Sequence, residues 1–413
     1  MGEFPNIHDS AVGRPLPVAL GLNNLTGDTP GAIEALYVNT VTFIYQAAGA
    51  SLHSVPQVYS NGILKATPAD YTIANDGSGR TYIDFVADQG DNIVTFNCTG
   101  YMFALWNSTN GYVQNPAYIM AFYLAFIVGY PGDYFDWDSF ADLAELYEDG
   151  GWGKAGRLII QDKRPVDEVL RELLFTFGAK LWFSADGLLT IGRKDIKNFT
   201  TDHYVFSQID ALEYPARREN FADYINHTTS RYDFYPAPGI WKGAVEAERA
   251  KSIEDFEATR DPSTPWDFPW TPSAALVDNR INEELLKFGY GDKKLTLVLP
   301  LRWIDDLDIF TNFRFQDPFA ISADGSGESG RYYYIESLDP DPLNNRITIR
   351  AIDLQWLLRQ YCVLGDEGAL ASNWSAAPDA DRMFCYACDE ADGLFDDDES
   401  GKVLIDENLL GTS

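Results

Sequence analysis

The sequence predicts a β-rich α+β protein, and three features carry that prediction. Short strand-like runs separated by turn residues fill residues 35–100, and similar runs return from His203 onward. Between them, Pro165–Arg193 combines a helical pattern with a hairpin pattern. The chain has 413 residues, which is too long for one core, so we expect about two to four domains.

The first hundred residues predict an extended arm followed by a β domain. Residues 1–30 are rich in proline and glycine, which disfavours helix. Strand-like runs follow at Ala35–Tyr45, Val55–Tyr59, Ile63–Lys65, Tyr71–Ala74, Thr81–Val86 and Ile93–Cys98, with turns at Ser60-Asn61-Gly62 and Asn75–Gly79. Short strands at this spacing predict a β-barrel or sandwich.

An α+β segment begins at Asn115-Pro116. Tyr118–Val128 predicts a buried helix, and Ser139–Glu148 predicts a second helix with Asp138 as its N-cap. A third helix is predicted after Pro165, and Gly178 stands where a helix ends in a left-handed residue. Lys180–Ser184 and Leu188–Ile191 flank Asp186-Gly187, which predicts a hairpin.

The rest of the chain returns to β structure. Strands are predicted at His203–Phe206 and Tyr224–Tyr235, and Ala244–Asp255 fits a helix or a charged strand edge. The prolines of Asp261–Pro272 predict an extended linker, and Ser273–Phe288 predicts a helix. The last predicted strands are Leu295–Leu299, Arg314–Phe315, Tyr332–Ser337 and Arg346–Leu354, the final two paired across the Asp339–Asn345 turn.

The net charge of −31 limits the classes of partner. A surface this acidic repels nucleic-acid phosphates, so tight DNA binding is disfavoured, whereas DNA passing through an acidic, water-lined channel is not. No apolar run reaches the ~18 residues that span a membrane, and the N-terminus lacks a signal-peptide pattern. Four cysteines in a chain of this length indicate a reducing compartment.

One acidic group offers an enzymatic interpretation. Beside Tyr134, Trp137 and Tyr147 lie seven carboxylates: Asp133, Asp136, Asp138, Asp142, Glu145, Glu148 and Asp149. A pair of acids among aromatic rings is what a glycoside hydrolase needs. The alternative, which a chain with 62 acids favours, is the solvated face of an acidic helix. The four histidines and the missing G-x-S-x-G, H-E-x-x-H and Walker motifs support no other catalytic set.

Two C-terminal patterns are candidate metal sites. Cys362, Cys385 and Cys388 supply three thiols, but zinc and iron–sulfur sites want four ligands, so free buried thiols are favoured. Asp396, Asp398, Ser400 and Glu407 occupy positions 1, 3, 5 and 12 of a calcium loop. Leu404 is unusual at position 9 and no helix is predicted after the loop, so a solvated acidic loop is the favoured interpretation.

Four phrases, in order along the chain, resemble the central hub or tail-tip proteins of long-tailed bacteriophages and gene transfer agents. The first is F-P-N-I-H-D-S-A-V-G-R-P-L-P-V-A-L-G at the start, and the second is H-S-V-P-Q-V-Y-S-N-G-I-L followed by D-Y-T-I-A. The third runs from N-P-A-Y-I-M through Asp138–Phe140 to Gly187-Leu188-Leu189. The fourth is G-R-Y-Y-Y-I-E-S-L-D-P-D-P-L-N-N-R-I-T-I-R-A. The likeness spans most of residues 1–360.

The resemblance implies a virion structural protein with no enzymatic activity and no cofactor. Three copies would form a ring in which two barrel-like tube domains per chain make a pseudo-sixfold collar. Its partners would be the distal tail protein, the tape-measure protein and a central fibre or spike, with DNA only as passing cargo. Some family members carry a C-terminal iron–sulfur domain with four cysteines, whereas this chain offers only three thiols there.

The expected domains follow from this resemblance together with the residue patterns. They are an arm and first barrel-like domain (1–110), an α+β insert (111–200), return strands and linker (201–272), a second barrel-like domain (273–360) and an acidic segment (361–413). Two alternatives stay open. One is a carbohydrate-active, cell-wall-degrading enzyme that uses the Asp133–Asp149 acids. The other is a distal-tail ring or receptor-binding protein of the same virion.

Overall fold

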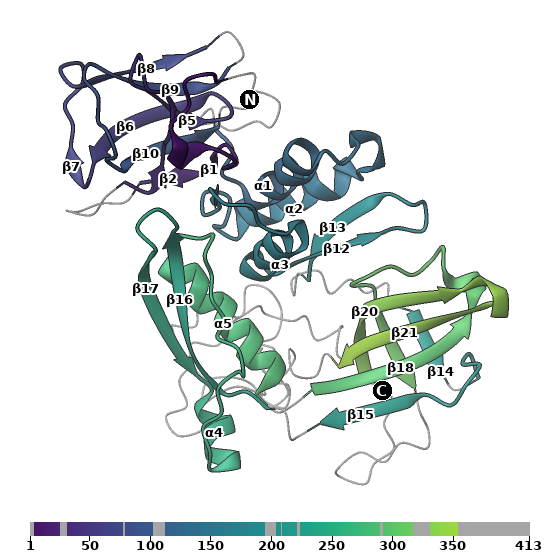
Figure 1. Ribbon diagram of the computed structural model, residues 1–413. Coiled ribbons are helices and arrows are strands. Elements are labelled where there is room, and N and C mark those ends of the chain that lie inside the picture. The colour runs from purple at the N-terminus through teal and green to yellow at the C-terminus, as the bar shows by residue number, and fades with distance from the viewer. Residues whose placement is uncertain are drawn as a thin grey trace, which may run out of the picture. The chain divides into compact units, whose positions relative to one another are not determined.

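The computed structural model describes residues 4–24, 31–76, 79–101, 112–194, 204–207, 209–220, 224–289, 292–316 and 331–353. The fold is β-rich α+β, as predicted (Figure 1). The chain divides into two compact units. Unit 1 comprises Met1–Gly192, Thr228–Ala247 and Pro262–Asn282, and unit 2 comprises Arg193–His227, Glu248–Asp261 and Glu283–Ser413.

Unit 1 begins with two antiparallel sheets that share one hydrophobic cluster. The strands are β2 (Leu22–Asn23), β3 (Ile33–Glu34), β4 (Leu36–Asn39), β5 (Ile44–Ala48), β6 (Leu52–Ser60), β7 (Ile63–Leu64), β8 (Tyr71–Asn75), β9 (Thr81–Phe85) and β10 (Val94–Tyr101). One sheet has the order β2-β10-β6-β7 with β3 also paired to β10, and the other has the order β4-β5-β9-β8. Strand β9 alternates buried and half-buried residues, so one of its faces is turned to the core.

The first predicted hairpin of this β domain is confirmed. Strands β6 and β7 pair antiparallel, with Ser60 opposite Ile63. Asn61 and Gly62, the two loop residues, have φ of 47° and 77°. A two-residue loop with both φ values positive matches the twist of antiparallel strands, which explains the Asn-Gly pair.

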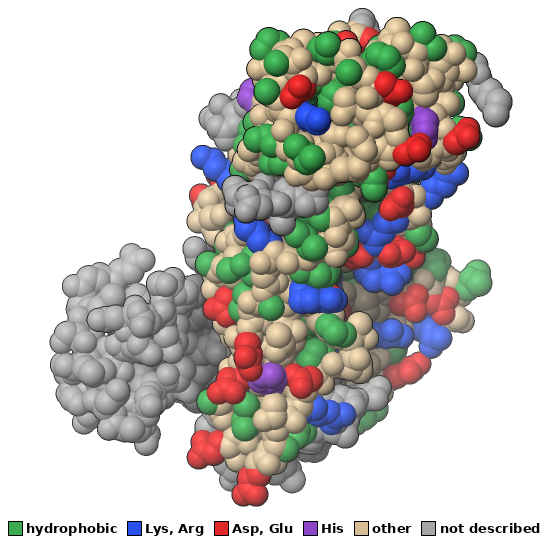
Figure 2. All heavy atoms as spheres, turned by 60° about the vertical axis from the view of Figure 1, so that its left-hand side comes forward, with side chains coloured by type: hydrophobic (Ala, Val, Ile, Leu, Met, Phe, Trp, Pro, Cys, Tyr) green, Lys and Arg blue, Asp and Glu red, His purple; other side chains and the backbone are tan. Residues whose placement is uncertain are grey.

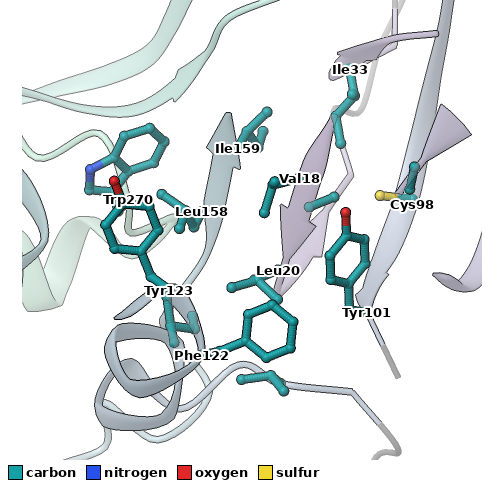
Figure 3. Packing of buried hydrophobic residues seen from close by; sticks show 14 of the residues in the cluster. Val18, Leu20, Ile33, Cys98, Tyr101, Phe122, Tyr123, Leu158, Ile159 and Trp270 are labelled. Carbon is teal, nitrogen blue, oxygen red and sulfur yellow. The ribbon is translucent and has the colours of Figure 1, made fainter. Parts of the chain in front are cut away.

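The N-terminal arm joins this β domain to the α+β part of unit 1. A 3-10 turn at Asp9–Ala11 precedes β1 (Val18–Leu20), which pairs antiparallel with β11 (Leu158–Ile160). Figure 3 shows Val18 and Leu20 of β1 beside Leu158 and Ile159 of β11, with Trp270 on the opposite side of β11. The pairing places strand β1 in the core of unit 1.

Three helices and a hairpin form the α+β part. They are α1 (Pro116–Phe122), which continues as a π-helical turn over Tyr123–Val128, α2 (Trp137–Asp149), α3 (Val166–Phe177), β12 (Ala179–Phe183) and β13 (Leu189–Arg193). Gly178 ends α3 with φ of 67°, as predicted. The predicted buried helix at Tyr118–Val128 is helical and mostly buried, but its last three residues are exposed. Phe126, Ile127 and Val128 are 53%, 41% and 39% exposed, because the π-helical turn carries them beyond the core.

The next segment is a hairpin with two helices. Strands β16 (His227–Tyr235) and β17 (Ile240–Glu248) pair with each other, and α4 (Ala250–Phe256) and α5 (Ala274–Phe288) follow. Ala244–Asp255 fitted a helix or a strand in the sequence. The structure shows a strand followed by a helix in this segment: β17 ends at Glu248, and α4 starts at Ala250. No helix among the described residues is long and apolar enough to cross a membrane.

Unit 2 is built on a six-stranded sheet of order β14-β19-β20-β21-β18-β15. The strands are β14 (Tyr204–Ser207), β15 (Ala216–Asn220), β18 (Asp292–Pro300), β19 (Asn312–Gln316), β20 (Arg331–Asp341) and β21 (Arg346–Asp353). Only the β14–β19 pair is parallel. The predicted pairing of the last two strands is confirmed, with Asp341 opposite Arg346. Leu295, Leu297 and Leu299 alternate along β18 and are fully buried.

The strand orders bear on the predicted barrels. In the parts of the chain that the structure describes, none of the sheets has a strand order that closes on itself. Two barrel-like domains therefore stay a prediction, while a β-rich α+β fold is what the structure shows.

Candidate functional site

The acidic residues singled out in the sequence lie on and before helix α2. Phe140, Leu143, Ala144 and Tyr147 form its buried face. Asp138, Asp142, Glu145 and Asp149 recur at helical spacing on its exposed face. This is the arrangement expected of an amphipathic helix with a solvated acidic side.

Two of these acids have structural roles. Asp136, not Asp138 as predicted, is the N-cap of α2, and its carboxylate accepts a hydrogen bond from the Ser139 backbone N–H at 3.3 Å. The Thr190 hydroxyl also donates to Asp136, at 3.3 Å. The helix starts two residues earlier than a cap at Asp138 requires, because Trp137 already has helical geometry. Glu148 accepts a hydrogen bond from the Asn115 amide at 3.2 Å.

Aromatic rings surround the start of α2. Phe135 and Trp137 stack with centroids 4.8 Å apart, and Tyr130 makes edge contacts with Tyr134 and Phe135. Tyr134 and Trp137 are 54% and 40% exposed. Tyr147, by contrast, is buried, and its hydroxyl donates to the Phe177 carbonyl at 2.9 Å. Exposed aromatic rings therefore accompany the acids at the start of α2.

The predicted metal sites fall outside the described residues. These are the thiols Cys362, Cys385 and Cys388 and the calcium-loop residues Asp396, Asp398, Ser400 and Glu407. Both sites stay predictions. Within the described ranges, no group of three or more His, Cys, Asp or Glu residues could hold a metal ion. Cys98 is buried, and burial raises the pKa of its thiol well above the usual range.

A buried ion pair, which sequence analysis missed, lies in the core of unit 1. Arg157 and Asp233 both have fully buried side chains, and Arg157 Nη2 lies 2.8 Å from Asp233 Oδ1. The same nitrogen donates to the carbonyls of Phe234 and Pro269. The Tyr235 ring lies under the guanidinium, 4.1 Å from its Cζ. Arg157 thus connects the end of β16 and the Phe268–Trp270 segment to the start of β11.

Burial governs the electrostatics of this pair. Burial lowers the pKa of the Arg157 guanidinium, and the charge of Asp233 acts in the opposite direction. Nε and Nη1 of Arg157 have no hydrogen-bond acceptor of normal geometry among the described residues. Asp233 has φ of 62°, a left-handed conformation that aspartate tolerates better than most residues. In the sequence, Arg157 lies among apolar residues in A-G-R-L-I-I, and Asp233 lies among aromatic residues in Y-D-F-Y. Such neighbours indicate that each charge is buried, but no local pattern shows that the two residues pair.

A cavity of about 330 Å³, here called the β11 cavity, lies beside the ion pair within unit 1. Its apolar walls include Ile159, Phe234, Trp241 and Trp270. Gln161, Asp162, Arg164, Glu172 and Asp267 provide polar groups. Trp270 is only 2% exposed, and its Nε1–H has no acceptor among the described residues.

The charged residues of the β11 cavity are mostly paired. Arg164 forms ion pairs with Glu168 and Glu172. Arg231 donates to both carboxylate oxygens of Asp267, and its Cζ lies 4.7 Å from the centroid of the Trp241 ring. Asp162 is exposed and makes no hydrogen bond that the structure describes, and its charge adds to that of Glu34 in raising the pKa of Arg14. The cavity therefore combines aromatic walls with hydrogen-bonding groups and little unpaired charge.

No protein-family model and no curated protein matches the chain. Three solved structures align with most of it. The tail protein from Neisseria meningitidis MC58 is 10% identical over 75% of this chain and 86% of that one, with a TM-score of 0.33. Prophage tail protein gp18 from Listeria monocytogenes EGD-e is 9% identical over 82% and 94%, with a TM-score of 0.34. The 43 kDa tail protein of prophage MuSo2 from Shewanella oneidensis is 10% identical over 83% and 95%, with a TM-score of 0.32.

Superpositions this loose carry no argument about the fold or function of this chain. The functional conclusion therefore depends on its own residues and geometry.

Proposed function

We propose that this chain is a structural protein of a bacteriophage tail and forms a trimeric hub at the tail tip. The hub joins the tail tube and distal ring to a central fibre or spike and surrounds the end of the tape-measure protein. DNA passes through its channel without being bound. The chain has no enzymatic activity of its own in this proposal.

One observation supports the proposal: the phrases that resemble the hub family form regular elements in the described parts of the chain. Val18–Leu20 of the first phrase is strand β1. His53–Leu64 is the β6–β7 hairpin, and Asn115 caps the α1 helix that opens the α+β part. The described part of the last phrase, 331–351, forms the paired strands β20 and β21.

The domain arrangement of the proposal follows the sequence. Residues 1–110 and 273–360 form the two barrel-like tube domains, and 111–200 form the insert. Residues 201–272 return the chain to the second tube domain, and 361–413 form an acidic tail segment. Three copies of two tube domains give the pseudo-sixfold collar, since each ring position is occupied by one domain.

The mass of the purified protein in solution tests this proposal. Sedimentation equilibrium or light scattering is expected to give three times the chain mass of 46.2 kDa. A hexamer favours the distal-tail ring, and a persistent monomer contradicts the hub. Gold-labelled antibody on intact virions gives a second readout, in which label at the axial tip is expected and label off the axis overturns the proposal.

A cell-wall-degrading enzyme is the second candidate, and one observation favours it. Asp133, Tyr134, Trp137 and Asp138 are exposed together at the start of α2. If these acids act on polysaccharide, purified cell walls lose turbidity with the wild-type protein and keep it with Asp138→Asn. Asp186→Asn, which changes an exposed acid in the turn between β12 and β13, is the matched control. We expect no lysis with any of the three proteins.

A further inference from the structure

We propose that the β11 cavity of unit 1 is a binding site for a neutral saccharide. This inference does not depend on the tail-hub proposal, because it uses only the residues that line the cavity. Its volume of about 330 Å³ lies at the small end of the ~300–1,000 Å³ range of ligand pockets.

The aromatic walls suit the C–H face of a sugar ring. Trp241 and Phe234 lie with ring centroids 4.9 Å apart at 43°, and both are half-buried. Arg231, itself held by Asp267, packs on the Trp241 ring and fixes its orientation. A flat, pre-oriented indole beside a second ring offers an apolar surface at little entropic cost to the ligand.

The polar groups suit hydroxyls. Asp162 offers two carboxylate oxygens to adjacent hydroxyls, and Gln161 offers its amide oxygen, since its amide nitrogen donates to the Glu34 carbonyl. The Glu172 oxygens accept from Arg164 and keep further lone pairs for a hydroxyl. A hydroxyl both donates and accepts, so it can also pair with the Arg164 guanidinium. The shielded Trp270 Nε1–H, which has no acceptor among the described residues, can be satisfied by a water that a bound ligand retains.

The charge balance disfavours ionic ligands. Arg164 is neutralised by Glu168 and Glu172, and Arg231 by Asp267. An anion meets the exposed carboxylate of Asp162 and a chain of net charge −31, which repel it. A cation would gain only the exposed carboxylate of Asp162, where solvent weakens the attraction. A neutral ligand with an apolar face and several hydroxyls makes use of all of these groups.

Saturation-transfer difference NMR and tryptophan fluorescence titration test the proposal. The probes are the methyl glycosides of glucose, galactose, N-acetylglucosamine and rhamnose. We expect saturable binding of at least one, with Trp241→Ala weakening it at least tenfold and Asp162→Ala several-fold. Phe183→Ala removes an exposed aromatic ring outside the cavity and is the matched control, so it should leave the affinity unchanged.

The outcome is decided even if Trp241→Ala misfolds, because Asp162 is exposed and its replacement leaves the core intact. If none of the four glycosides saturates at tens of millimolar, the proposal is overturned. It is equally overturned if binding is unchanged in both Trp241→Ala and Asp162→Ala. A proline-rich peptide that saturates the protein where the glycosides do not would assign the cavity to a protein segment instead.

Discussion

Arg157 is the residue on which three separate stretches of unit 1 converge. Its guanidinium contacts Asp233, the Phe234 carbonyl and the Pro269 carbonyl, while its backbone N–H donates to the Trp270 carbonyl at 3.0 Å. A charge removed from water in this way is costly unless it stays paired. The stability of unit 1 therefore depends on both members of the pair together.

Arg157→Met is expected to destabilise the protein by about 3 kcal/mol, because it leaves the buried Asp233 carboxylate with only the half-exposed Lys242 ammonium, 3.5 Å away, as a charged partner. Urea unfolding followed by tryptophan fluorescence measures the change. Adding Asp233→Asn to Arg157→Met should restore part of the loss, since no lone charge remains and asparagine also accepts a left-handed backbone.

Arg171→Met is the matched control for that substitution. Arg171 pairs with Asp167 on the surface of α3, and both side chains are about three-quarters exposed. Exposed pairs of this kind contribute about 0.5 kcal/mol or less. If Arg157→Met costs no more than Arg171→Met, the buried pair does not stabilise unit 1.

Tyr235, beneath Arg157, predicts how the protein responds to base. Burial raises the pKa of Tyr235 to about 12, and the charge of Asp233 acts in the same direction. Since an unfolded tyrosine titrates near pH ~10, the stabilisation is complete below that pH and is lost as the pH rises from ~10 towards ~12. The free energy of unfolding should therefore fall above pH ~10, and less steeply in Tyr235→Phe. Equal slopes in the two proteins would contradict this assignment.

At the scale of elements, the acids of helix α2 differ in how much they contribute to stability. Asp136→Ala should cost about 1 kcal/mol, because the N–H of Ser139 loses its acceptor. Asp142→Ala, an exposed mid-helix acid, should change stability by less than about 0.5 kcal/mol. Thermal unfolding monitored by circular dichroism compares the two. A larger effect at Asp142 would show that the acidic face, not the cap, holds the helix.

Elements with local signals could be predicted from the sequence. The Asn61-Gly62 and Asp186-Gly187 hairpins, the Gly178 helix end and the β20–β21 pair all rest on residues within a few positions of one another. The segment Asp261–Pro272 was predicted to be an extended linker. It forms no regular helix or strand, but its end is buried, with Phe268 and Trp270 only 0% and 2% exposed.

Long-range features could not be predicted. The β1–β11 pair, the parallel β14–β19 pair and the Arg157–Asp233 contact each join residues far apart in the chain. Strand register and charge pairing across such distances depend on the whole packed core, not on local pattern. The β11 cavity was missed for the same reason, because its walls come from Ile159, Phe234, Trp241 and Trp270, which lie in separate segments.

At the scale of the whole molecule, charge is the dominant property. Figure 2 shows acidic and basic side chains interleaved on one face, so the excess of acid does not leave that face purely negative. With a net charge of −31, the chain as a whole nevertheless repels phosphate groups.

The protein should therefore not retain double-stranded DNA, even at low salt, in an electrophoretic mobility assay. Counterion release favours DNA binding only where lysine and arginine neutralise phosphates. Retention that weakens steeply as salt increases would reveal a basic track and would contradict a channel through which DNA passes freely.

The division of unit 1 among Met1–Gly192, Thr228–Ala247 and Pro262–Asn282 has a consequence during synthesis on the ribosome. Leu158 and Arg157 leave the exit tunnel roughly 110 residues ahead of Trp270, a delay on the order of ten seconds at usual elongation rates. Arg157 lacks its carboxylate partner until Asp233 emerges, roughly 75 residues later, and the side of β11 that packs on Trp270 stays uncovered for the whole interval. The nascent polypeptide should therefore recruit chaperones in that window, and a ribosome stalled before codon 262 should leave unit 1 sensitive to protease.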